Sequence, residues 1–241
     1  DKYIKNNIES TKNIISCMNK FKVEKIIFSS SAAVYGDEEK SPINENAQCS
    51  PVSVYAKTKL DSERLIKDFT DSGKGRAVIL RYFNPIGSIN SGQIYEVITD
   101  TSDNVIPKLK QSIFEQGKEF QIYGNDYETL DGTPIRDYIH VSDLISGHFH
   151  ALDYLLSQSN KQTYEIFNLG TGVGKSVLEL VNMFSKISKN KIPISFAGRR
   201  DGDVSVCYAD PSKSNKVLKW HAKKSFREMC ADSLENCNYG S

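Results

Sequence analysis

The alternation of short apolar strands with amphipathic helices is the feature that most constrains the fold of this chain. Residues 25–28 and 77–82 are rich in β-branched and aromatic side chains, which predicts two buried parallel strands. Between them, the Lys- and Glu-rich stretch 55–69 places its apolar residues on one side, as an amphipathic helix does. Strand, helix and strand in this order predict βαβ units, and therefore an α/β fold with a parallel sheet.

The rest of the chain continues this pattern in a less regular form. Ile4, Ile8 and Met18 share one helical face, so the opening residues predict a helix. Beyond Asn84 the predicted order is a loop over 87–103, a helix ending near Gly117, a strand over 120–123, a helix capped by Ser142, a strand over 164–169, a helix opened by the capping box of Ser176 and Glu179, a strand over 192–196 and a helix from Ser225.

Composition argues against several classes of function. Lys and Arg number 31 against 30 Asp and Glu, so the chain offers no general surface for nucleic acid. Its apolar runs are too short to cross a membrane. The five cysteines are scattered without a C-x-x-C pair. This argues against a disulfide framework or a metal site and favours a reducing cytoplasm.

A Tyr and a Lys four residues apart on the predicted helix offer an acid–base pair. The spacing puts Tyr55 and Lys59 on one face, within reach of a common ligand. A free phenol ionises near pH ~10, and a nearby ammonium lowers that pKa. Ser31, at the carboxyl end of the preceding strand, can complete a proton relay where open α/β sheets bind ligands. Taken alone, Y-x-x-x-K is weak, because a solvated helix face explains it equally simply.

Six ordered blocks give this pair a family context. They are SSSAAVYG at 29–36, Y-x-x-x-K at 55–59, RYFNP at 81–85, GNDY, DGT and RDYIHV within 124–141, NLGTG at 168–172 and RRDGD at 199–203. In this order the blocks are similar to those of extended short-chain dehydrogenase/reductases. Among these, the chain resembles the UDP-glucose 4-epimerases along nearly its whole length. The resemblance implies NAD-dependent interconversion of UDP-glucose and UDP-galactose.

The resemblance assigns catalytic roles to Ser31, Tyr55 and Lys59. Tyr55 would remove the 4-hydroxyl proton while a hydride passes to NAD. Lys59 would bind the nicotinamide ribose and hold down the pKa of Tyr55, and Ser31 would bridge the sugar and Tyr55. The 4-keto sugar would then turn over and take the hydride back on its other face. Asn6 and Phe83 would contact the cofactor together with Tyr55 and Lys59.

The resemblance also implies a set of substrate-binding residues. Two arginines suit a diphosphate, an aromatic ring suits uracil, and Asp203 can accept from a ribose hydroxyl. Cys207 is a small residue where a Tyr would close the sugar site, so UDP-GlcNAc and UDP-GalNAc are expected as further substrates. The full set is Ser31, Asn84, Asn104, Val105, Tyr123, Arg136, Arg200, Asp203 and Cys207.

The implied fold is an incomplete Rossmann-type doubly wound parallel sheet with a smaller α/β lobe. Residues 1–84 would form the C-terminal part of the NAD-binding Rossmann domain. Residues 85–241 would mainly form the UDP-sugar-binding lobe, with some segments returning to the Rossmann domain. The family's G-x-G-x-x-G turn is not found in the sequence, so we expect it, with the first strands, on about 90 residues upstream of Asp1. Without them, we expect the chain to be a poor epimerase.

Two other interpretations stay open. A 4,6-dehydratase or decarboxylase would share the fold, although Ala32 and Ala33 stand where those enzymes carry a Thr and acidic residues for water elimination. A truncated, non-catalytic homologue would at most bind a UDP-sugar or serve as a partner subunit. For the epimerase itself, the resemblance implies a cytoplasmic homodimer that acts in galactose metabolism.

Two further patterns predict no function. Residues 169–176 (LGTGVGKS) are close to a phosphate-binding loop, but Leu169 stands where that loop needs a Gly. We therefore expect an ordinary tight turn between a strand and a helix. His140, within the RDYIHV block, is expected to be structural.

Overall fold

Three parallel strands form the central sheet of the molecule in the order β1–β2–β6. They are β1 (Lys25–Ser31), β2 (Arg76–Tyr82) and β6 (Tyr164–Leu169). The computed structural model describes residues 2–37, 40–89, 104–115, 117–159 and 163–235. In the sheet, Ser31 lies opposite Tyr82, and Tyr82 lies opposite Leu169. The carboxyl ends of all three strands therefore meet at one edge, which is where parallel sheets place their ligands.

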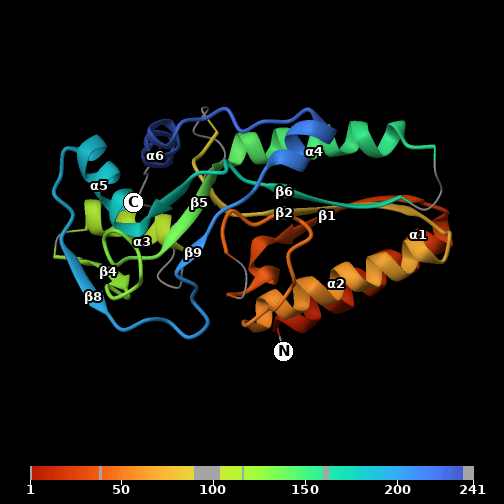
Figure 1. Cartoon of the computed structure of the whole chain (residues 1–241), viewed down its shortest axis with the longest axis horizontal. Helices are drawn as coiled ribbons and strands as arrows, with labels where there is room; N and C mark the ends of the chain where they lie inside the picture. Colours follow the sequence, from red (N-terminus) through yellow and green to blue (C-terminus); the bar gives the residue numbers. More distant parts are fainter. Residues whose placement is uncertain (1, 38–39, 90–103, 116, 160–162, 236–241) are drawn as a thin grey trace.

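Helices cover both faces of this sheet (Figure 1). One face carries η1 (Ile4–Glu9), α1 (Ser10–Phe21) and α2 (Val54–Asp71), and the other carries α4 (Val141–Ser157). The Ser53 hydroxyl caps α2 by accepting from the amide of Ala56 at 3.1 Å, which fixes the first turn of this helix beside the end of β1. No helix in the described ranges is long and apolar enough to cross a bilayer.

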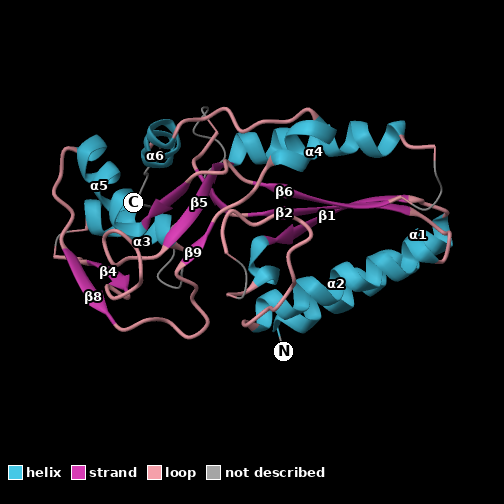
Figure 2. Ribbon diagram, viewed as in Figure 1, coloured by secondary structure: helices cyan, strands magenta, loops and turns pink. Residues whose placement is uncertain are grey.

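A second region lies beyond the carboxyl ends of these strands (Figure 2). Its strands are β3 (Asn84–Ile86), β4 (Phe120–Tyr123), β5 (Ile135–His140), β7 (Gly174–Ser176), β8 (Ile194–Ala197) and β9 (Val206–Cys207). β5 pairs with β3, β7 and β9, and β4 pairs with β8. The helices here are α3 (Val105–Phe114), α5 (Val177–Ser188) and α6 (Phe226–Leu234). Two short turns, η2 (Ala32–Tyr35) and η3 (Ser214–Leu218), complete the described elements.

A buried ion pair joins α2 to the central sheet. Arg81 Nη2 lies 2.6 Å from Glu63 Oε2, and the two side chains are 4% and 2% exposed. The Ser30 hydroxyl donates to the other carboxylate oxygen of Glu63. The guanidinium also lies over the Tyr35 ring, 4.9 Å from its centroid. Because every charge in this cluster is paired or hydrogen-bonded, α2 is held in one position relative to β1 and β2.

Most of the elements predicted from the sequence are present, with one correction at a cap. The helix predicted to start at Ser142 is instead capped by His140, whose Nδ1 accepts from the Ser142 amide at 3.0 Å. The imidazole precedes the first turn and so reaches its amides, whereas Ser142 already lies inside the helix. The predicted loop over 87–103 lies mostly outside the described residues. The division of the chain at residue 84 stays a prediction.

Candidate active site

Ser31 lies where β1 passes into the η2 turn. Its hydroxyl oxygen accepts a hydrogen bond from the amide of Ala33 at 3.2 Å, which caps the turn. The same side chain is close enough to the phenol of Tyr55 to lower its pKa. The structure therefore brings Ser31 and Tyr55 together from elements that are separated by a long loop.

Tyr55 and Lys59 lie one turn apart near the start of α2, and both are half-buried. Lys59 Nζ donates to the carbonyl oxygen of Ser29 at 2.9 Å and lies 5.8 Å from the centroid of the Tyr55 ring. The Tyr3 ring packs edge-on against Tyr55, with 5.7 Å between ring centroids. The three residues with predicted catalytic roles thus form one corner at the carboxyl end of β1, which we call the catalytic corner.

Burial dominates the electrostatics of the catalytic corner. Burial raises the pKa of Tyr55, the neighbouring Tyr82 raises it further, and the Ser31 side chain opposes these effects only in part. Burial also lowers the pKa of Lys59. In this chain the pKa of Tyr55 is raised overall, and the role of Lys59 in lowering it stays a prediction. The Lys59 ammonium is engaged by the Ser29 carbonyl and lies beside the ring of Tyr55.

The other two residues expected to contact a cofactor lie apart from each other. Phe83 is 6% exposed and packs in a core cluster with Tyr35 and Leu60. Asn6 is exposed on η1 and lines neither of the cavities described below. Of the residues predicted to bind the cofactor, the structure brings Tyr55 and Lys59 together, and Phe83 lines the smaller of the two cavities described below.

Two adjoining cavities hold all nine residues of the implied substrate set. The larger cavity, of about 560 Å³, is lined by Asn104, Val105, Tyr123 and Arg200 among others. The smaller, of about 190 Å³, is lined by Ser31 and Cys207 among others. The two cavities share Asn84, Arg136 and Asp203, and therefore form one continuous site across the ends of the strands.

Four basic residues and the Tyr123 ring are set in the otherwise mostly apolar wall of the larger cavity. The guanidinium of Arg200 lies 3.8 Å from the centroid of the Tyr123 ring. Arg136 forms an ion pair with Asp203, and its Nη1 donates to the carbonyl of Ile135 at 2.7 Å. The stacked and paired guanidinium groups are pre-oriented, so an anion that binds here loses little of its affinity to ordering them.

Sequence reasoning missed two lysines of this cavity, Lys108 and Lys110. Lys110 is only 3% exposed although it carries an ammonium group. Both lie on α3, which starts at Val105, a residue of the implied set. The sequence did offer a signal for these two lysines, because they follow the predicted binding residue Val105 on the same helix.

Away from Arg136 and Asp203, which it shares with the larger cavity, the smaller cavity is lined by uncharged residues, many of them small, and by the hydroxyl-bearing residues Ser31, Ser53 and Tyr82. Ala33 and Gly202 leave space that larger residues would fill. Burial raises the pKa of the Cys207 thiol to about 11, so this wall of the cavity is uncharged at neutral pH. The cavity therefore suits an uncharged, hydroxyl-bearing group.

The loop that resembles a phosphate-binding loop is occupied by a side chain of the protein itself. The carboxylate of Asp137 is fully buried and accepts from the amides of Thr171, Gly172 and Ala209 at 2.9–3.1 Å. The Thr171 hydroxyl donates to it at 2.6 Å. These amides are therefore not available to a phosphate. The expected direct turn from strand to helix is also interrupted by the short strand β7.

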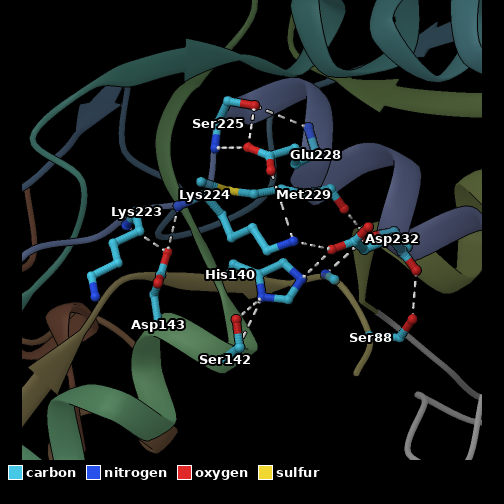
Figure 3. Close-up of polar contacts among 12 residues, drawn as sticks. Ser88, His140, Ser142, Asp143, Lys223, Lys224, Ser225, Glu228, Met229 and Asp232 are labelled. Carbon is cyan, nitrogen blue, oxygen red and sulfur yellow. Dashed lines mark hydrogen bonds and ion pairs between the residues drawn. The ribbon is translucent and has the colours of Figure 1, made fainter. Parts of the chain in front are cut away.

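His140 has structural partners, as expected from the sequence. Its Nδ1 accepts from Ser142, so the ring proton is on Nε2, which lies 3.2 Å from Asp232 Oδ2 (Figure 3). Lys224 Nζ donates to the same carboxylate at 3.0 Å. The Ser88 hydroxyl donates to the carbonyl of Asp232. Because Ser88 lines the larger cavity, this network fixes the wall that α6 gives to that cavity.

Comparison with known proteins gives consistent matches. The family model described as GDP-mannose 4,6 dehydratase matches residues 1–233. UDP-glucose 4-epimerase of Bacillus subtilis is 44% identical over 233 residues, which cover 96% of this chain and 68% of that protein. Two solved structures are also similar. UDP-glucose-4-epimerase from Stenotrophomonas maltophila, with bound NAD and formylated UDP-arabinopyranose, gives a TM-score of 0.92 at 37% identity over 98% of this chain and 69% of that chain.

The second structure is UDP-glucose 4-epimerase from Bifidobacterium longum in complex with NAD+ and UDP. It gives a TM-score of 0.91 at 40% identity, and the match covers 98% of this chain and 70% of that chain. The predicted Rossmann-type α/β class is confirmed by these structures. The chain spans roughly two thirds of the length of the proteins it matches, 68% to 70% in these three comparisons.

Proposed function

The chain belongs to the UDP-glucose 4-epimerase family, and from this premise we propose that the natural protein interconverts UDP-glucose and UDP-galactose with NAD. One observation carries the proposal. All nine residues of the implied substrate set line two adjoining cavities, and the smaller cavity is lined by Ser31, whose side chain is close enough to Tyr55 to affect its pKa. A nucleotide and a hexose joined by a diphosphate match two cavities that meet at an arginine.

The UDP group is assigned to the larger cavity. The Tyr123 ring offers an apolar face to uracil, and Arg200 and Arg136 supply charge-assisted hydrogen bonds to the diphosphate. Asp203 keeps a carboxylate oxygen for a ribose hydroxyl while its other oxygen pairs with Arg136. The ion pair therefore orients both residues before a ligand arrives.

The hexose is assigned to the smaller cavity, with its 4-hydroxyl at Ser31 and Tyr55. Tyr55 takes the proton of that hydroxyl, and Ser31 relays or orients it. In the chain without NAD, burial raises the pKa of Tyr55 and therefore keeps its phenol protonated. NAD, when bound, supplies a reversible hydride acceptor and, in its oxidised form, a positive charge that favours the phenolate.

Lys59 has the geometry to hold a ribose next to Tyr55. An ammonium has three donors, and among the described residues Ser29 is the acceptor that Lys59 meets. The remaining donors are available to ribose hydroxyls. The residues present thus fit the nicotinamide end of NAD.

Substrates with an N-acetyl group are included in the proposal. Cys207, Ala33 and Gly202 line the smaller cavity with small side chains, which leave room beside the hexose. Cys207→Tyr should fill that room and suppress turnover of UDP-N-acetylglucosamine while UDP-glucose turnover persists. Equal loss of both substrates would contradict the assignment.

A 4,6-dehydratase, the activity in the description of the matching family model, is a weaker candidate. Elimination of water needs an acid or base near C5 and C6 of the sugar. Among the described residues of the smaller cavity, the one carboxylate is Asp203, which pairs with Arg136. Ala32 and Ala33 supply no proton-transfer group. Detection of a 4-keto-6-deoxy product would favour the dehydratase.

A cytoplasmic location, a role in galactose metabolism and a homodimer are part of the same proposal. The four described cysteines are free thiols, which suits a reducing compartment. Helix α1 exposes Ile14 and Phe21, which are 50% and 68% accessible and offer apolar surface for association. Sedimentation of the natural protein would report the mass of the assembly, and a monomer at micromolar concentration would contradict the homodimer.

The experiment that tests the proposed function follows UDP-galactose by proton NMR. The natural full-length protein with NAD should convert it to UDP-glucose until the two sugars reach equilibrium. Tyr55→Phe should remove that activity while the fold is retained. A well-folded wild-type protein that binds UDP and leaves UDP-galactose unchanged would instead support the non-catalytic interpretation.

A further inference from the structure

A histidine on α4 reaches across the sheet to the end of β1. His148 Nε2 lies 2.9 Å from the Ser29 hydroxyl, and its Nδ1 lies 2.9 Å from the carbonyl of Leu144. A carbonyl only accepts, so Nδ1 carries the proton of the neutral ring and Nε2 presents a lone pair. The Ser29 hydroxyl must therefore donate to His148.

Ser29 also contacts the catalytic corner. Its carbonyl oxygen accepts from Lys59 Nζ at 2.9 Å. Burial raises the pKa of Tyr82, which lies near Ser29. Tyr82 in turn lines the smaller cavity and is close enough to Tyr55 to raise its pKa.

The direction of the Ser29–His148 hydrogen bond is set at the His148 end, where the Leu144 carbonyl decides which nitrogen accepts. If the acceptor is removed, the Ser29 hydroxyl loses this partner. The residue whose carbonyl holds Lys59 then loses its side-chain anchor to α4.

We propose that His148 is a positioning residue for the epimerisation: by accepting from Ser29 it holds the strand end to which Lys59 is bound. His148 acts through Ser29, and its ring centroid is 6.4 Å from that of Tyr82. The inference rests on the proposed function, because a positioning role matters only if Tyr55 and Lys59 carry out the epimerisation. No feature of the sequence blocks singles out this residue.

Two variants of the natural full-length protein test the proposal. His148→Phe keeps the ring volume and removes the acceptor, whereas His148→Gln restores an acceptor oxygen near the position of Nε2. We expect Phe to lower kcat for UDP-galactose by about tenfold with KM within about twofold, and Gln to recover most of the loss. Equal kcat in wild type and His148→Phe, or equal impairment of both variants, would overturn the proposal.

A double-mutant cycle with Ser29→Ala separates positioning from general packing. Because His148 acts through the Ser29 hydroxyl, the double variant Ser29→Ala/His148→Phe should lose no more kcat than the more impaired single variant. Additive losses would mean that His148 has a separate packing role and would overturn the proposal.

A measurement independent of turnover tests the direction of the Ser29–His148 hydrogen bond. In protein labelled with ¹⁵N-histidine, whose four histidines can be assigned by substitution, His148 should show a protonated Nδ1 and an unprotonated Nε2 near neutral pH. In Ser29→Ala, the Nε2 resonance should shift because its donor is lost. A protonated Nε2 in wild type would overturn the inference even if the protein proves not to be an epimerase. Loss of all turnover in the wild type, with the expected tautomer, would count only against the proposed function.

Discussion

The two cavities are neighbours, but their functional groups are controlled in opposite ways. In the larger cavity, Arg200 lies over Tyr123 and Arg136 pairs with Asp203, so charged groups are ready to meet an anion. In the catalytic corner, burial acts against charge: it raises the pKa of Tyr55 and lowers that of Lys59. We therefore propose that the chain binds a nucleotide diphosphate with its own residues, whereas the proton chemistry proposed for Tyr55 needs a further positive charge beside it.

The largest effect is expected from removal of the phenolic hydroxyl in the catalytic corner. Tyr55→Phe should lower epimerase turnover of the full-length protein by about 10²- to 10⁴-fold, because no other group replaces the base. The affinity for UDP should change little, since Tyr55 lines neither cavity. Turnover is measured with UDP-galactose and affinity by calorimetry. A variant that keeps more than a tenth of the wild-type turnover would break the assignment of the base.

The scaffold of the catalytic corner should be the most sensitive point for stability. Glu63→Gln leaves the buried Arg81 without its counter-charge, and breaking such a pair costs about 3–5 kcal/mol of unfolding free energy. Urea denaturation followed by circular dichroism gives this value. The matched control is Asp71→Asn, which breaks the exposed pair with Lys67 and should cost less than about 0.5 kcal/mol. Similar losses in both variants would show that the Glu63–Arg81 pair has no special role.

The larger cavity can be tested with two adjacent arginines. Arg200 lies in the cavity over Tyr123, whereas Arg199 pairs with Asp126 at the surface. Arg200→Ala should weaken UDP binding by about 10- to 100-fold, the loss of one charge-assisted contact. Arg199→Ala should leave the Kd for UDP within about twofold, because the same charge is removed outside the cavity. An equal effect of both substitutions would show that UDP binding depends on overall positive charge and not on a specific contact with Arg200.

The smallest effect concerns the ionisation of Tyr55 in the absence of NAD. Because burial raises the pKa of Tyr55, its phenolate should form only above the ordinary value of about 10. A difference titration at 295 nm between wild type and Tyr55→Phe reports this step. The raised pKa also means that the contribution of Tyr55 to stability is present below about pH 10 and is lost as the pH rises further. A midpoint below 10 would show that Lys59 lowers the pKa of Tyr55 without help.

Motifs and local patterns predicted the parts of the structure that depend on nearby residues. The capping box of Ser176 and Glu179 is present, and a second one joins Ser225 and Glu228 at the predicted start of α6. Such signals are readable because the partners lie within one turn. The substrate set was carried by the resemblance, and the structure gathers it in the two cavities.

The interactions that sequence reasoning could not supply join distant parts of the chain. The Ser29–His148 contact joins residues 119 positions apart. The Asp137 carboxylate accepts from the amide of Thr171, 34 residues further along the chain. In neither contact does the local sequence around one residue predict its distant partner. The direction of the Tyr55 pKa shift was missed for a related reason. Spacing on a helix brings Lys59 near Tyr55. It does not reveal that burial raises the pKa of Tyr55 or that the Lys59 ammonium donates to the Ser29 carbonyl.

The most direct test of this comparison is a calorimetric titration of UDP into the 241-residue chain without NAD, in the wild-type and Tyr55→Phe forms. If the larger cavity binds the nucleotide with its own residues, both forms should bind one UDP with Kd values that agree within about twofold. The absence of UDP binding by the wild-type chain, or its loss in Tyr55→Phe, would contradict the separation of binding from chemistry.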